Sequence, residues 1–149
     1  MKGKLVVALA LALCPVLLPF GKAGSGGNAC DLVTKEEVEE VIGQKIDIVE
    51  VQPGYGNCIY YTKEKLLNEI LKIPVVTVGY TRSDVQERWN SWSSMPKSET
   101  IKGLGDGAVW SPTYGFFVCK FKGGLLMISV ENKDMAIKLA KKALGRIKP

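Results

Sequence analysis

The 149-residue chain contains no histidine. This absence excludes a Ser-His-Asp triad, a Cys-His nucleophile pair, an imidazole metal ligand and a histidine pH switch. An enzyme of this composition would depend on paired carboxylates, but most acidic residues stand among lysines or at expected helix starts, as on a solvated surface. None lies isolated in an apolar stretch, the setting that raises a carboxyl pKa. We therefore expect no catalytic residues, no cofactor and no metal site, with a carboxylate-dependent hydrolase as a less favoured alternative.

A long uncharged run stands near the N-terminus, from Leu5 to Phe20, preceded by two lysines. Residues 21–23 read Gly-Lys-Ala, which places small residues at the −3 and −1 positions of a cut after residue 23. A membrane-spanning helix needs about 20 apolar residues, and two prolines interrupt this run. We therefore expect a secretory signal peptide over residues 1–23 and an exported protein, in the periplasm, at the cell surface or outside the cell.

A lipoprotein signal is the alternative to this interpretation. It requires an aliphatic residue and two small residues before a cysteine. Cys14 follows Leu-Ala-Leu, whose last residue is too large, and Cys30 follows Gly-Asn-Ala, which lacks the aliphatic residue. Contact with a membrane is expected only if the chain is lipid-anchored in this way.

The basic charge of the chain belongs mainly to the expected signal. The formal net charge is +5, and Lys2, Lys4 and Lys22 supply three of these charges in a segment without acidic residues, which leaves +2. Lysines near the C-terminal end of the helix expected at 133–146 interact favourably with the helix dipole. This segment has none of the interleaved aromatic residues that single-stranded nucleic-acid binders use. We therefore expect no nucleic-acid partner, and an unknown protein or cell-envelope ligand instead.

Three cysteines, Cys30, Cys58 and Cys119, remain after removal of the signal. An oxidising compartment favours a disulfide, and an odd count leaves one thiol free. A Cys30–Cys58 bridge would close a loop of about 29 residues, worth about 3–4 kcal/mol. Cys119 lies in an apolar strand, where a buried thiol acts as a small hydrophobic residue. We predict the Cys30–Cys58 bridge; three reduced, buried thiols are the alternative, and the spacing does not suit zinc.

Hydrophobic periodicity predicts helices that alternate with groups of strands. Helices are expected at 34–43, 84–93 and 133–146, and strands at 45–51, 58–62, 75–81, 98–102, 108–110, 115–121 and 125–130. Thr34 and Glu37 form a capping box at the first helix, which Gly43 ends. Ser83 is expected to cap the second helix and Asn132 the third.

This order of elements does not alternate strands with long helices, so it does not predict a doubly wound parallel sheet. We expect a flexible leader at 24–29 and a single α+β domain at 30–149, in which three helices pack on a mainly antiparallel sheet. Residues 63–71 fit either a short helix or a loop.

Four aromatic residues are candidate contacts for a ligand or partner. Trp89 and Trp92 share one side of the second helix, where they could form a platform for a sugar, peptide or lipid. Large aromatic residues more often pack a helix onto a sheet, and we favour that interpretation. Tyr55 and Tyr114 lie at expected loop tips.

The glycine-rich segment at 103–107 is a further candidate, because it resembles a phosphate-binding loop. It lacks the Gly-Lys-Ser/Thr ending, and no long helix follows it, so we interpret it as a turn between strands.

Three short motifs resemble those of small exported bacterial domains of unknown function, many of them lipoproteins. Residues 29–38 read ACDLVTKEEV, residues 57–60 read NCIY and residues 103–110 read GLGDGAVW. The resemblance implies a Cys30–Cys58 bridge and an α+β sheet domain, and it implies no catalytic residues, because the family has no established general activity. The chain departs from the pattern in Cys119 and in its poor lipoprotein signal.

Taken together, these observations favour an exported, non-catalytic binding or structural domain. An inhibitor or partner-blocking domain, with an exposed aromatic loop tip, is the alternative.

The signal interpretation predicts the N-terminus of the exported protein. Mass spectrometry of the protein recovered from the envelope or medium of the expressing cells should place the first residue at Gly24. An N-terminus at an acylated Cys30 would support the lipoprotein alternative, and retention of Met1 would contradict both.

Overall fold

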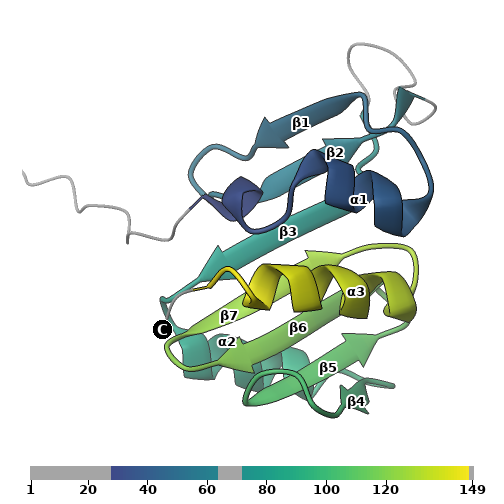
Figure 1. Ribbon diagram of the computed structural model, residues 1–149. Coiled ribbons are helices and arrows are strands. Elements are labelled where there is room, and N and C mark those ends of the chain that lie inside the picture. The colour runs from purple at the N-terminus through teal and green to yellow at the C-terminus, as the bar shows by residue number, and fades with distance from the viewer. Residues whose placement is uncertain (1–27, 64–71, 148–149) are drawn as a thin grey trace, which may run out of the picture.

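The computed structural model describes residues 28–63 and 72–147 (Figure 1). The expected signal at 1–23, most of the leader and nearly all of the ambiguous segment at 63–71 lie outside these ranges. The elements are η1 (Ala29–Asp31), α1 (Lys35–Ile42), β1 (Ile48–Val51), β2 (Cys58–Tyr61), β3 (Val76–Thr81), α2 (Val85–Ser93), β4 (Glu99–Ile101), β5 (Gly107–Ser111), β6 (Phe116–Phe121), β7 (Gly124–Ser129) and α3 (Lys133–Leu144).

The strands form one seven-stranded sheet in the order β1-β2-β3-β7-β6-β5-β4, and every neighbouring pair is antiparallel. It consists of two meanders, β1–β3 and β4–β7, that meet where β3 pairs with β7 from Thr77↔Ser129 to Thr81↔Leu125. The predicted single α+β domain with an antiparallel sheet and three helices is confirmed.

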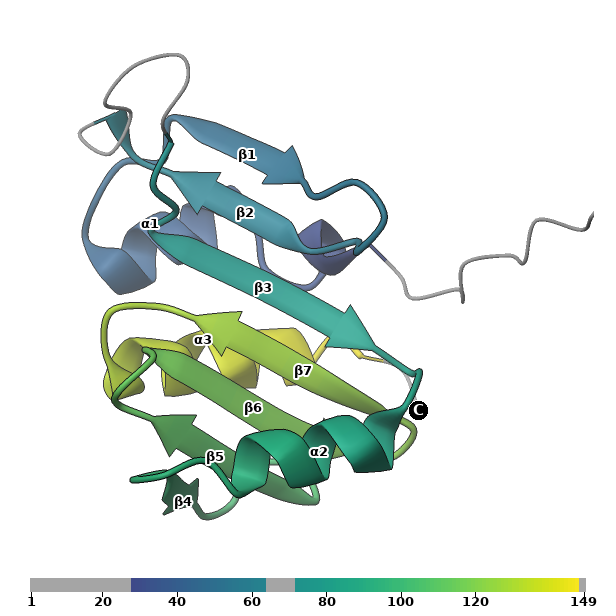
Figure 2. The same ribbon diagram turned by 180° about the vertical axis from the view of Figure 1, so that it is seen from behind.

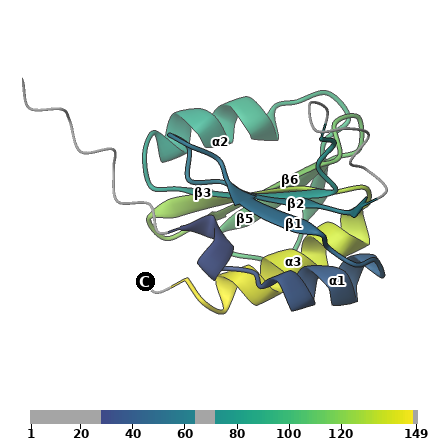
Figure 3. The ribbon, with the colours of Figure 1, turned by 90° about the horizontal axis from the view of Figure 1, so that it is seen from above.

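The helices divide between the two faces of the sheet. Helices α1 and α3 cover one face, and α2 lies on the other, across the β6–β7 half (Figures 2 and 3). Side chains alternate between the faces along each strand, so Leu126 and Ile128 of β7 enter the main core, whereas Leu125 enters a smaller core beneath α2. Both faces of the second meander are therefore covered.

The predicted caps of the first and third helices are confirmed. Thr34 Oγ1 accepts a hydrogen bond from the Glu37 amide at 3.3 Å, and Glu37 Oε2 accepts one from the Thr34 amide at 2.9 Å. Gly43 follows α1 in the left-handed region, with φ 69°. Asn132 Oδ1 accepts from the Met135 amide at 3.0 Å at the start of α3.

The predicted cap of the second helix is wrong. Asp84, not Ser83, occupies the N-cap position of α2, with φ 51° and no side-chain capping bond. The Ser83 amide donates instead to Thr81 Oγ1 at 3.1 Å, so Ser83 belongs to the turn that leaves β3. Aspartate tolerates the left-handed conformation better than most residues, which lets the chain turn sharply into the helix.

The N-terminal part of the domain is fastened to β2. The predicted Cys30–Cys58 disulfide is present, with 4.9 Å between the Cα atoms. Tyr60 Oη, fully buried, donates to the carbonyl of Val33 at 2.6 Å. Ala29, which composition assigned to a flexible leader, is itself fully buried, so the folded domain includes it.

An ion-pair cluster joins the ends of the chain where α1 lies against α3. Arg146 donates to both carboxylate oxygens of Glu37 at 2.7 Å and to the Leu32 carbonyl at 2.8 Å. Lys142 pairs with Glu40 at 3.1 Å. The hydrogen bonds from Arg146, opposed by partial burial, lower the pKa of Glu37 to about 2.

We predict that Glu37→Gln destabilises the protein by about 1–2 kcal/mol at pH 7, because it removes a carboxylate that caps α1 and pairs with Arg146. The pKa of Glu37 is lower in the folded state, so its stabilisation is complete above pH 4.5 and is lost as the pH falls toward 2. Urea unfolding at pH 7 and pH 3 measures both effects.

The matched control is Glu36→Gln, at an exposed position one residue away on the same helix. It should change the free energy of unfolding by less than about 0.5 kcal/mol. An equal decrease in the free energy of unfolding in Glu37→Gln and Glu36→Gln would mean that the ion-pair cluster adds no stability of its own.

Candidate ligand-binding cleft

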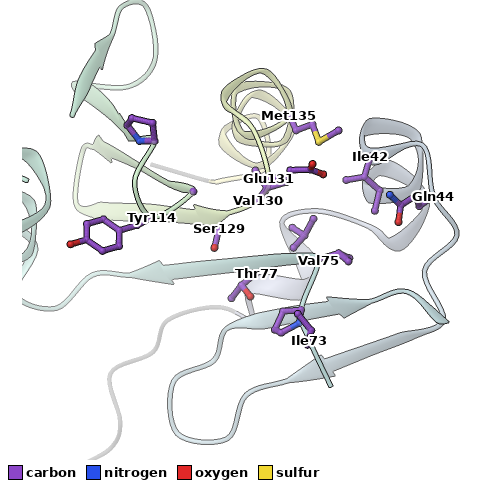
Figure 4. Close-up of a pocket in the computed structure, with 14 residues that line it drawn as sticks. Ile42, Gln44, Ile73, Val75, Thr77, Tyr114, Ser129, Val130, Glu131 and Met135 are labelled. Atoms are coloured by element: carbon purple, nitrogen blue, oxygen red, sulfur yellow. The ribbon is translucent and has the colours of Figure 1, made fainter. Parts of the chain in front are cut away.

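A cleft of about 510 Å³ opens at the end of the sheet where the two meanders meet. Beyond the Thr77↔Ser129 pair the chains separate, since Ile73 and Pro74 lead into β3 while Val130 and the residues after it lead into α3. The β5–β6 turn and the end of α1 complete the walls (Figure 4). The volume falls in the range of small-molecule sites.

The lining is divided between apolar side chains and polar groups. The apolar lining residues are Ile42, Ile73, Pro74, Val75, Val76, Pro112, Val130 and Met135. Hydroxyl side chains come from Thr77 and Ser129, and an amide from Gln44. Thr77 and Ser129 are cross-strand neighbours on the face opposite the main core, so the cleft wraps around the end of the sheet.

Glu131 is the one carboxylate among the lining residues. Its side chain extends from the end of β7 toward Ile42 at the end of α1 (Figure 4). Within residues 28–63 and 72–147, no salt bridge involves Glu131, whereas nearby Lys133 is paired with Glu99 at 2.6 Å. The cleft therefore combines an aliphatic interior with one unpaired negative charge.

Tyr114 is the predicted contact residue that the structure places in the cleft. It lies in the β5–β6 turn, on the side of the cleft opposite Ile42 and Gln44, and is 62% exposed, with its ring pointing away from the other lining residues (Figure 4). Tyr55 is 74% exposed in the β1–β2 turn. Because β1 and β5 run in opposite directions in the sheet, these two turns lie at opposite ends of it. The two tyrosines therefore do not form one surface.

Trp89 and Trp92 lie away from the cleft, on α2. Both are half-buried against the smaller core, and the Trp92 ring packs on Phe116 with 4.2 Å between ring centroids. The Trp89 ring lies where a β-carbon on Gly107 would approach it to 3.2 Å. The interpretation that these rings pack the helix onto the sheet is confirmed.

The glycine-rich segment also has a packing role. Leu104 is buried in the main core, and the Asp106 amide donates to the Lys120 carbonyl at 2.7 Å. Gly105 has φ 53°, and a β-carbon there would overlap the Lys120 carbonyl oxygen and lie 2.7 Å from Cys119 Sγ. Residues 103–107 therefore pack against β6, as expected for a turn between strands.

Among the cysteines in the described residues, Cys119 is the free one, and it is fully buried on β6. Burial, assisted by the nearby charge of Asp106, raises the pKa of its thiol to about 11. A neutral, enclosed thiol of this kind is a poor nucleophile. It acts as a small hydrophobic side chain, as the sequence predicted.

The described part of the chain contains no group of three or more cysteine, aspartate or glutamate side chains arranged to hold a metal ion. None of the helices between residues 28 and 147, with 64–71 set aside, has the length and apolar character that a membrane crossing requires. The paired carboxylates that a hydrolase would need are not found among the described lining residues.

Comparison with known proteins identifies no relative. No protein-family model matches the chain, and no curated protein matches it. The resemblance to exported bacterial domains therefore rests on the three short motifs alone.

Sequence reasoning missed most of the cleft, since its lining comes from five separate segments. Ser129 looks like an ordinary polar residue within a strand, and Glu131 like one that follows it. The prolines at 74 and 112 mark the points where the chain leaves the sheet beside the cleft, and they are the one local signal that could have located it.

We predict that Gly105→Ala destabilises the protein by roughly 2–4 kcal/mol, through left-handed strain and overlap with β6. The control is Gly103→Ala, where φ is 78° but no atom lies within 4 Å of the added carbon. The Gly103→Ala variant should lower the free energy of unfolding by about 1–2 kcal/mol, from left-handed strain alone. Thermal unfolding followed by circular dichroism makes the comparison, and equal losses would contradict the packing role.

Proposed function

We propose that this protein is an exported, non-catalytic domain that binds a small amphiphilic molecule in the cleft between the two meanders. The observation that carries the proposal is the cleft itself, in which aliphatic side chains lie beside polar groups and a single carboxylate, Glu131, forms none of the described salt bridges. Concave, mainly apolar sites with few polar groups are the usual form of small-molecule sites in proteins.

The chemistry of the lining favours a ligand with an apolar body and a cationic head. An aliphatic segment can displace water from Ile42, Val75 and Met135. An ammonium group can pair with Glu131 and can donate further hydrogen bonds to hydroxyl oxygens of the lining, such as those of Thr77 and Ser129. An anionic head would meet the same carboxylate as a like charge.

Export is supported by two features of the chain. The N-terminal segment has the charge, apolar run and small residues of a secretory signal. The Cys30–Cys58 disulfide is of the kind that persists in oxidising compartments. A partner-blocking domain remains the second candidate, since Tyr55 and Tyr114 are both largely exposed at turns.

Three six-carbon probes test the ligand class: n-hexylammonium, hexan-1-ol and hexanoate. Titration into ¹⁵N-labelled protein should shift the amide resonances of residues 73, 75–77, 114–115 and 129–131. We expect hexylammonium to bind roughly two- to fivefold more tightly than hexanol, as for one exposed charge pair, and hexanoate to bind most weakly.

The Glu131→Gln variant should abolish the difference between hexylammonium and hexanol without loss of stability, because Glu131 is exposed. Glu87→Gln, at an exposed position on α2, is the matched control and should leave the difference unchanged. Equal binding of all three probes, or shifts confined to other parts of the protein, would contradict the proposal.

A further inference from the structure

Strand β1 forms one edge of the sheet, opposite the edge formed by β4 (Figures 1 and 2). It has the sequence Ile-Val-Glu-Val, which is rich in β-branched residues. An edge strand presents a row of backbone N–H and C=O groups that can pair with another strand.

The outward groups of β1 belong to Val49 and Val51. Gln52 donates to the Asn57 carbonyl at 2.8 Å, which makes this a hydrogen-bonded pair in the β1–β2 register. Hydrogen-bonded pairs recur at every second residue, so Glu50 and Ile48 also face β2. The backbone groups of Val49 and Val51 therefore point away from the sheet, and none of the described turn and loop hydrogen bonds involves them.

The side chains of the same two valines are also exposed. Val49 is 39% exposed and Val51 is 48% exposed, on one face of the strand. Glu50, between them, points to the other face, where its carboxylate pairs with Lys72 at 2.5 Å. The one charge on this edge is thus neutralised within the subunit.

The β4 edge differs in each of these respects. It has three residues, of which Glu99 and Thr100 are exposed, and lysines stand close to it at 97 and 102. Short, charged edges of this kind discourage pairing with another strand. Strand β1 has charged neighbours, Lys45 and Asp47, on one side only, and its exposed valines lie toward the other end.

We infer that β1 is a self-association surface, which pairs antiparallel with β1 of a second copy of this chain across a two-fold axis. The strand is self-complementary, because Val49 of each copy faces Val51 of the other. Each outward N–H then donates to the C=O of the partner's facing valine, and the exposed valine side chains meet on one face.

The charges of the two copies are compatible with this register. Glu50 lies on the two-fold axis opposite Glu50 of the second copy, and each brings its own Lys72. Like charges directly opposite each other oppose strand pairing, and the two lysines, one beside each carboxylate, reduce that repulsion because the group of four charges has no net charge. The two-fold symmetry of this register is specific to pairing with a second copy, because a strand of another sequence would not repeat the same contacts.

Sedimentation velocity of the purified protein tests the association. The contact is small, so we expect a reversible dimer that forms between roughly 10 and 500 µM. Val51→Lys should keep the protein monomeric over this range, whereas Thr100→Lys on the β4 edge should leave the equilibrium unchanged. A monomer at all concentrations would overturn the inference.

Cysteine pairing tests the register. In a Cys14→Ser background, Val49→Cys and Val51→Cys each add one exposed thiol, because Cys119 is buried and Cys30 is bridged to Cys58. Facing residues have Cα atoms about 5.5 Å apart, which suits a disulfide, whereas identical residues are displaced by two positions.

A mixture of the two variants, one labelled with ¹⁵N, should therefore form mainly the mixed disulfide under mild oxidation. Mass spectrometry distinguishes the mixed dimer from the two symmetric dimers. A statistical distribution, or an equal yield from Thr100→Cys, would overturn the proposed pairing.

Discussion

The antiparallel pairing of β3 with β7 is the contact on which the rest of the structure depends. Each meander pairs strands that are consecutive in the chain, but only the β3–β7 pairing joins the two into one sheet. It places Val78 beside Ile128 in the main core, and it brings α1 and α3 onto the same face. The cleft exists because the same two strands separate at one end, and the edge at β1 exists because the sheet does not close.

The two ends of the chain are attached to this sheet by different kinds of contact. The disulfide and the Tyr60 hydroxyl fasten the N-terminal segment to β2, and the ion pair between Glu37 and Arg146 joins α1 to α3. Ile42, at the end of α1, lines the cleft. The contacts that hold residues 30–37 therefore also hold one wall of the candidate site.

Local sequence signals predicted the elements well where the cause is local. The capping box at Thr34 and Glu37, the left-handed Gly43 and the cap at Asn132 all occur as expected, because a cap involves residues within one turn of helix. The start of α2 was misplaced because Asp84 turns the chain by its backbone conformation rather than by a side-chain bond. Of the cleft, the sequence indicated only Tyr114, since the other walls come from segments distant in the chain.

By itself, the sequence determined which chemistry is excluded, which cysteines pair and that the fold is an antiparallel α+β domain. The lack of histidine excludes imidazole chemistry in any fold, and the periodicity of short segments reflects which side of each one is buried. Only the tertiary structure decided the strand order, the face that each helix covers, the cleft around Glu131 and the open edge at Val49 and Val51. These depend on pairings between distant strands, and no local pattern specifies which strand becomes the neighbour of another.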